Sequence, residues 1–133
     1  MNYQHTIQID NNRPTIKIND LEFLSLQDLL NTINVYPYIE SLIEEFKEIH
    51  KKSNDLNDLV QNKYNGYWEE EGAETFFTVL GYDNGLDVSF NQGMIYIEDE
   101  YQYPEVPRVK LDITEFIQIL ESWRDILKSH FKN

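Results

Sequence analysis

Hydrophobic and polar residues alternate at the beginning of the chain. In residues 5–9 and 15–18 the isoleucines occupy every second position, and the segment between them contains Asp10, two asparagines and Pro14. Strict alternation places apolar side chains on one face of a strand, and this set of polar residues favours a turn. The pattern therefore predicts an antiparallel β-hairpin.

The following segment, from residue 25 to residue 52, has helical spacing of its apolar residues. Ser25 is predicted to cap a first helix. Pro37 is predicted to interrupt it, with either a kink or a fresh start near Tyr36-Pro37, before the helical pattern continues to about Lys52. After a polar segment at 53–58, a further helical turn is predicted around Leu56, Leu59 and Val60. The two apolar stripes are Leu26, Leu29, Leu30 and Ile33, then Ile39, Leu42, Ile43, Phe46 and Ile49.

After Asn65-Gly66 the repeat of the hydrophobic residues changes from the helical period of about 3.6 residues towards the strand period of 2. Strands are predicted at 75–82, 86–90 and 94–98, because turn sequences that contain glycine separate them at 83–85 and 91–93. Short loops of this kind join neighbouring antiparallel strands, so the three form a meander. Residues 108–111 are predicted to add a strand at the edge of the sheet.

The last segment has the broadest apolar face in the chain. Asp112 followed by Glu115 resembles a capping box, and the residues that form the apolar face are Ile113, Phe116, Ile117, Leu120, Trp123, Ile126 and Leu127. Such a helix must lie on a sheet or on a partner. We therefore expect a single α+β domain over residues 1–133, in which an antiparallel sheet (N-terminal hairpin plus central meander) packs against helices that include a long C-terminal helix.

The composition excludes several classes of function. The chain has 24 acidic and 11 basic residues, a formal net charge of −13, and no cysteine. A polyanion repels nucleic-acid phosphates and anionic membrane surfaces, so neither is expected as a partner. The absence of cysteine excludes disulfides and thiolate metal sites. Because the first residues lack the basic and apolar regions of a signal peptide and no segment is apolar enough to span a bilayer, we expect a cytoplasmic protein.

The negative charge is concentrated in the middle of the chain. Residues 64–107 contain ten acids, no lysine and no arginine, together with six of the nine tyrosines. Tyrosine and tryptophan are frequent interface anchors, and carboxylates around them select a basic partner. The alternative is that the aromatics simply suit strands and the charge serves solubility. The candidate partner-binding residues are Tyr67, Trp68, Glu69, Glu70, Glu71, Asp83, Asp87, Glu98, Asp99, Glu100, Tyr101 and Tyr103.

No motif for catalysis, metal binding or cofactor binding emerges. The three histidines are far apart in sequence, and adjacent carboxylates in a strand point to opposite faces, so the acidic triplets are not ready acid–base pairs. The segment 83–87 has oxygen ligands but lacks the spacing of a calcium loop. No phosphate-binding loop is present. We therefore expect a protein that is not an enzyme and has no metal or cofactor.

The C-terminal third resembles a known group of inhibitors. An acidic meander at 86–100, followed by the segment 109–116 that opens a final helix containing Trp123, is similar to small bacterial immunity proteins. These are the cognate inhibitors encoded beside polymorphic toxins, including those of contact-dependent inhibition systems. The resemblance covers about 50 residues. It implies a protein that binds and inhibits a cognate basic toxin domain, such as a nuclease, by occupying its phosphate-binding cleft with an acidic, tyrosine-rich surface.

Three other functions remain open at this point. A DNA-mimic inhibitor of a restriction or repair nuclease would need acids at phosphate-like spacing. An acidic adaptor or scaffold would dimerise through an exposed helix face. An enzyme acting on a small cationic substrate would need two carboxylates that converge in a pocket. The sequence does not decide between a monomer and a homodimer.

Overall fold

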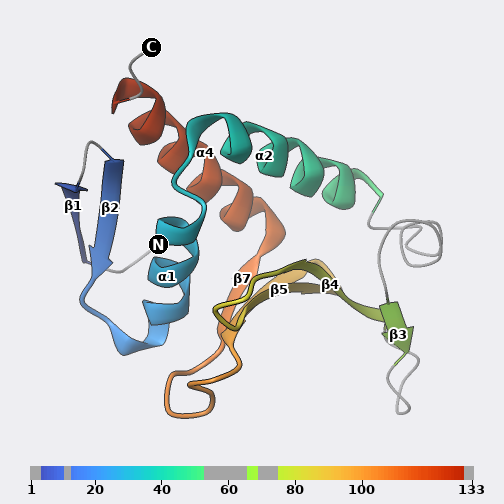
Figure 1. Cartoon of the computed structure of the whole chain (residues 1–133). Coiled ribbons are helices and arrows are strands. Elements are labelled where there is room, and N and C mark those ends of the chain that lie inside the picture. Colours follow the sequence, from blue (N-terminus) through green and yellow to red (C-terminus); the bar gives the residue numbers. More distant parts are fainter. Residues whose placement is uncertain (1–3, 11–12, 53–65, 69–74, 131–133) are drawn as a thin grey trace.

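The computed structural model describes residues 4–10, 13–52, 66–68 and 75–130, with the backbone alone described for 66–68 and 75–77. The chain begins with an antiparallel hairpin of β1 (His5–Asp10) and β2 (Arg13–Ile18), in which Ile7 lies opposite Ile16. The predicted hairpin is confirmed. Its inner face, with Ile16 and Ile18 buried, packs towards the helices (Figure 1).

A five-stranded antiparallel sheet forms the second half of the molecule. Its order is β3-β4-β5-β6-β7, so each strand lies next to its neighbours in sequence. The three predicted strands of the meander and the predicted edge strand are confirmed, whereas β3 was not predicted. The strands are β3 (Gly66–Trp68), β4 (Thr75–Gly81), β5 (Leu86–Asn91), β6 (Met94–Asp99) and β7 (Val109–Asp112).

The first helix begins differently from the prediction. A 3₁₀ turn, η1 (Leu21–Phe23), leads into α1 (Leu24–Thr32), and the Asp20 carboxylate caps it by accepting a hydrogen bond from the Glu22 N–H at 3.0 Å. Ser25 lies inside the first turn of α1 and is fully buried, so its prediction as the cap was wrong. The chain enters the helical conformation one turn earlier, where an acidic side chain can accept from a free backbone N–H.

The two longer helices follow the predicted pattern. α2 (Tyr36–Lys51) starts afresh with Pro37 in its first turn. α4 (Ile113–His130) is preceded by Asp112, whose carboxylate accepts a hydrogen bond from the Thr114 N–H at 2.8 Å. Hydrogen bonds from Thr114 hold the pKa of Asp112 below its usual value, because they favour the charged carboxylate.

The core lies between the helices and one face of the sheet. α4 contacts β6 and β7, and α2 packs beside α4, while α1 lies between the sheet and the hairpin (Figure 1). Phe46 and Phe116 meet edge to face at 4.9 Å between ring centroids, and the buried Trp123 Nε1 donates to the Leu30 carbonyl at 2.9 Å. One hydrophobic cluster joins residues from hairpin, helices and sheet. The fold is therefore α+β, as predicted.

Part of the sequence-based prediction lies outside the described residues. This is true of the polar segment at 53–58 and of the helical turn around Leu56, Leu59 and Val60. None of the helices in the described part of the chain is long and apolar enough to cross a membrane.

Candidate partner-binding surface

The turn between β4 and β5 and the segment that follows β6 are held together. Gly85 has a positive φ of 90°, which glycine adopts without strain, and a Cβ at this position would collide with the ring of Tyr101. The Glu100 N–H donates to the Gly85 carbonyl at 2.9 Å, and Asn84 Oδ1 accepts from the Leu86 N–H at 3.2 Å. Two segments that carry predicted site residues thus form one end of the sheet.

Carboxylates converge on this end because of the strand register. Asp87 on β5 lies directly opposite Glu98 on β6. Partial burial raises the pKa of Asp87, and the negative charges of Glu100 and Glu98 raise it further. Like charges disfavour one another's ionised forms only at short range. The three carboxylates therefore form a local excess of negative charge on a partly buried strand surface.

Arg108 provides one basic group at this site. Its guanidinium donates to Glu98 Oε1 at 2.9 and 3.1 Å, and it lies 5.8 Å from the ring centroid of Tyr96 and 5.2 Å from that of Tyr103. These are cation–π distances. Arg108 follows directly after the segment without basic residues, and the sequence analysis placed it in the edge strand but not among the candidate binding residues. Arg108 compensates the charge of Glu98 and lies over the ring of Tyr103.

Asp99 differs from its acidic neighbours. It is only 6% exposed, and its two carboxylate oxygens accept hydrogen bonds from the Tyr101 N–H at 3.0 Å and from Gln102 Nε2 at 2.7 Å. Its side chain shapes the turn after β6 and is not presented on the surface. A buried carboxylate with these partners has a structural role in this turn.

Apart from Asp99, whose side chain is buried in the turn after β6, the predicted residues fall into three groups. Those that the structure brings together are called the acidic end: Asp83, Asp87, Glu98, Glu100, Tyr101 and Tyr103. Tyr67 and Trp68 lie on β3, which pairs with the first residues of β4 and so lies at the other end of that strand from the turn. Glu69, Glu70 and Glu71 lie outside the described residues. Whether any of these residues binds a partner stays a prediction.

The middle of α1 contributes an acidic residue that sequence analysis missed. Burial raises the pKa of Asp28, and the charge of Asp99 raises it further. Asn84 Nδ2 donates to Thr32 Oγ1 at 3.3 Å, so the β4–β5 turn touches the last turn of α1. No local sequence signal connects residues 28 and 99, because their proximity arises only when α1 packs beside the sheet.

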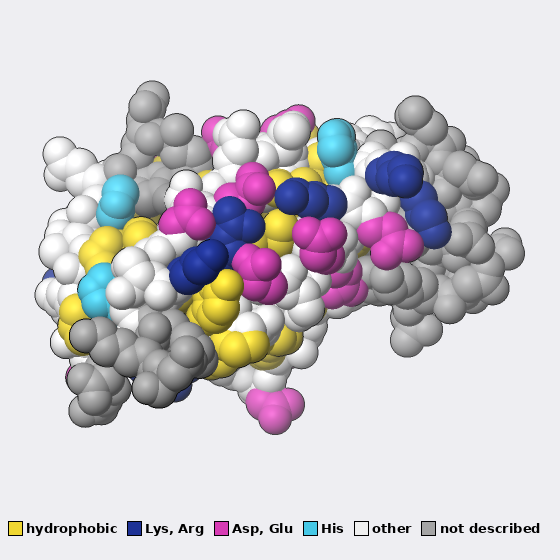
Figure 2. All heavy atoms as spheres, turned by 90° about the horizontal axis from the view of Figure 1, so that it is seen from above, with side chains coloured by type: hydrophobic (Ala, Val, Ile, Leu, Met, Phe, Trp, Pro, Cys, Tyr) yellow, Lys and Arg dark blue, Asp and Glu magenta, His cyan; other side chains and the backbone are white. Residues whose placement is uncertain are grey.

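The outer surface of α2 and α4 carries its charges in a different arrangement. Figure 2 shows acidic and basic side chains mixed over this face. Arg124 Nε lies 3.3 Å from Glu40 and 3.1 Å from Asp125, and Lys47 lies 3.5 Å from Glu121. The helical face therefore provides each of these carboxylates with a base, whereas Arg108 alone does so within the described acidic end.

The acidic end presents two accessible aromatic rings. Tyr101 is 72% exposed and Tyr103 47% exposed, so both rings are accessible to a partner. Nowhere in the described part of the chain do three or more His, Asp or Glu side chains form a group that could hold a metal ion. Comparisons with protein-family models, with curated proteins and with solved structures found no match to this chain.

Proposed function

We propose that this protein is an immunity protein, which binds a cognate basic toxin domain and inhibits it without catalysing a reaction. The toxin domain that fits best is a nuclease, because its active cleft is built to bind phosphates and attracts carboxylates for the same reason. The resemblance of the segment 86–116 to immunity proteins motivates the class of function. The acidic end supplies the proposed toxin-binding surface.

The observation that carries the proposal is the clustering of weakly compensated carboxylates around accessible tyrosines. Asp87, Glu98 and Glu100 are close enough to raise the pKa of Asp87, and one arginine serves the group. Keeping like charges together lowers stability. A basic partner that docks here would relieve this repulsion, which gives the cluster a favourable electrostatic term in binding.

The two kinds of residue at the acidic end would act at different stages of binding. Carboxylates at the rim, such as Asp83 and Glu100, accelerate the approach of a basic domain and make it depend on salt. The exposed ring of Tyr101 lies against Gly85, so it has little conformational freedom to lose on binding. A stiff, amphipathic side chain of this kind suits the centre of an interface.

The experiment uses the basic C-terminal domain of the toxin encoded by the adjacent reading frame. The two proteins are co-expressed, and the affinity and association rate are measured by surface plasmon resonance at several salt concentrations. The triple variant Asp87→Lys, Glu98→Lys and Glu100→Lys is expected to slow association at least about tenfold. Tyr101→Ala is expected to cost at least about 2 kcal/mol of binding free energy, mainly through faster dissociation.

A control with the same change in net charge separates a local effect from a global one. Glu40→Lys, Glu44→Lys and Asp125→Lys lie on the exposed face of α2 and α4, away from the acidic end. Binding by this control is expected to stay within about threefold of that of the unmodified protein. Equal losses in the two triple variants, or no loss in the first, would rule out the acidic end as the toxin-binding surface.

A further inference from the structure

A pocket lies between the N-terminal hairpin, α1 and α4. Its volume is about 300 Å³, at the lower end of the range for sites that bind small molecules. Most of its wall is apolar, and the polar residues that line it are His5, Glu115, Gln118 and Ser122. This combination is typical of a small-molecule site, in which the apolar part supplies affinity and the few polar groups select the ligand.

The apolar part of the wall is fixed at its base and accessible above it. Trp123 is buried, and its Nε1 donates to the Leu30 carbonyl at 2.9 Å, which holds the indole ring in place. Ile7, Ile119 and Ile126 border the core but are only partly buried. An apolar ligand would remove their remaining surface from water, and a wall that is already ordered has little freedom to lose on binding.

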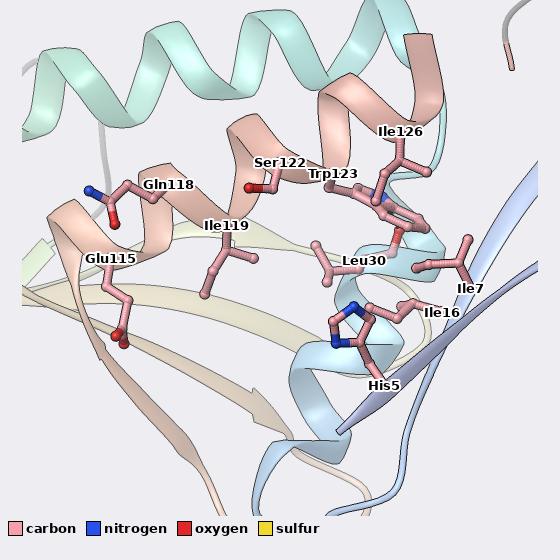
Figure 3. Close-up of a pocket in the computed structure, with 10 residues that line it drawn as sticks. All are labelled: His5, Ile7, Ile16, Leu30, Glu115, Gln118, Ile119, Ser122, Trp123 and Ile126. Atoms are coloured by element: carbon pink, nitrogen blue, oxygen red, sulfur yellow. Dashed lines mark hydrogen bonds between the residues drawn. The ribbon is translucent and has the colours of Figure 1, made fainter. Parts of the chain in front are cut away.

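The pocket is elongated along α4, with different chemistry at its two ends. Figure 3 shows Trp123 beside the hairpin and Glu115 at the start of the helix, with Ile119 between them. Eight residues separate Glu115 from Trp123, which corresponds to about 12 Å of helix. Glu115 is the one acidic residue among those that line the pocket, and the described lining includes no lysine or arginine. One end therefore presents a carboxylate and the other an aromatic ring.

The Glu115 carboxylate has no basic partner among the described residues. Arg108 and Lys110 line a second hollow that Glu115 also borders. The Arg108 guanidinium, however, pairs with Glu98 at 2.9 Å. The Lys110 ammonium lies 5.9 Å from the ring centroid of Tyr96. The charge of Glu115 is therefore available to a cationic ligand.

We propose that this pocket binds an amphiphilic primary amine, whose ammonium group pairs with Glu115 and whose unbranched apolar body lies along Ile119 and Trp123. Gln118 and Ser122 line the pocket from the same helix and can accept hydrogen bonds from an ammonium group. The net charge of −13 attracts a cation and repels a fatty acid of the same length. None of the lining residues belongs to the acidic end, so this site is independent of the proposed function.

The first test compares three ligands that share an alkyl chain and differ in their head group: octylamine, octanol and octanoate. It uses the full chain with Trp68→Phe, which leaves Trp123 as its one tryptophan, and follows tryptophan fluorescence. Octylamine is expected to give a saturable change and to bind at least about fivefold more tightly than octanol. Octanoate is expected to bind most weakly, because Glu115 repels it. Equal affinity for the three ligands would overturn the proposal.

A substitution at Glu115 tests the site of the head group. Glu115→Gln is expected to weaken octylamine binding at least about fivefold and to leave octanol binding within about twofold. The matched control is Glu121→Gln on the same helix, where Glu121 pairs with Lys47 at 3.5 Å. This control is expected to change octylamine binding by less than about twofold. Equal losses in the two variants, or no loss in the first, would rule out Glu115 as the partner of the amine.

NMR chemical shifts locate the bound amine directly. The indole N–H of Trp123 and the backbone amides of Ile7 and Ile119 are expected to shift as octylamine is added to the unmodified protein. Methylammonium, which carries the same charge without the apolar body, is expected to leave these signals unchanged. Shifts confined to the acidic end would mean that octylamine binds the carboxylates there, and the assignment of this pocket as the amine site would be wrong.

Discussion

The acidic end and the outer face of α2 and α4 both expose many carboxylates, but they differ in how the charges are compensated. On the helical face Lys47 and Arg124 lie within 4 Å of acids on the same or the neighbouring helix. At the acidic end Glu98 has Arg108 as its partner, and the pKa of Asp87 is raised partly by its own neighbours. Carboxylates are therefore attracted by neighbouring basic groups on the helical face and repelled by other carboxylates at the acidic end.

This difference indicates that the requirements of folding can account for the charges of the helical face but not for those of the acidic end. Ion pairs between packed helices contribute little individually, but they cost nothing in repulsion. A cluster of carboxylates on paired strands lowers the free energy of unfolding, and it persists here beside exposed tyrosines. The charges of the helical face are compatible with the needs of folding, whereas the acidic end carries a repulsion that folding alone does not favour.

The largest effect is expected from a substitution beneath the helical face. Phe46 is fully buried and packs edge to face on Phe116, so Phe46→Ala should lower the free energy of unfolding by about 3–5 kcal/mol through the cavity it leaves. Urea denaturation followed by circular dichroism measures this value. Glu100→Ala, at the exposed acidic end, should change it by less than about 0.5 kcal/mol. Similar losses for both variants would refute the division of roles between the two regions.

A smaller effect is expected within the acidic segment itself, where one carboxylate differs from the others. Asp99→Ala removes the acceptor of the Tyr101 N–H and of Gln102 Nε2 and should lower the free energy of unfolding by about 1–3 kcal/mol. The same denaturation experiment measures it, with Glu100→Ala as the neighbouring control. If the two alanine variants were equally stable, the structural role assigned to Asp99 would be incorrect.

The sequence predicted most of the fold because its signals are local. Alternation and glycine turns predicted β1, β2 and the meander, and the spacing of apolar residues predicted α2 and α4 within one or two residues. Ser25 was mistaken for a cap because a 3₁₀ turn that begins after Asp20 extends the helical segment towards the N-terminus. The three-residue strand β3 has too few residues to show a period.

The candidate surface could be predicted in part only. The gap in basic residues at 64–107 indicated where the charge lies in sequence, but not which carboxylates would meet. That outcome depends on the strand register, which places Asp87 opposite Glu98, and on the turn that buries Asp99. Arg108 reaches Glu98 through the pairing of β6 with β7. Asp28 approaches Asp99 only through the packing of segments that are far apart in the sequence.

The smallest effect tests the repulsion at the acidic end directly. Because the pKa of Asp87 is raised in the folded state by burial and by the charges of Glu100 and Glu98, ionised Asp87 lowers the free energy of unfolding at neutral pH. Asp87→Asn should therefore raise this free energy at pH 7, by a few tenths of a kcal/mol once solvent screening is allowed for.

The gain from Asp87→Asn should shrink as the pH falls through the folded-state pKa, and it should vanish below the unfolded value of 3.8, where Asp87 is protonated in both states. Urea titrations of the two proteins between pH 7 and pH 3 measure this difference. Asp125→Asn, at an exposed position beside Arg124, is the matched control on the helical face, and it should show no gain at pH 7. An equal gain in the free energy of unfolding for both variants would mean that Asp87 and Asp125 are equally destabilised by their surroundings. The contrast between the acidic end and the helical face would then be wrong.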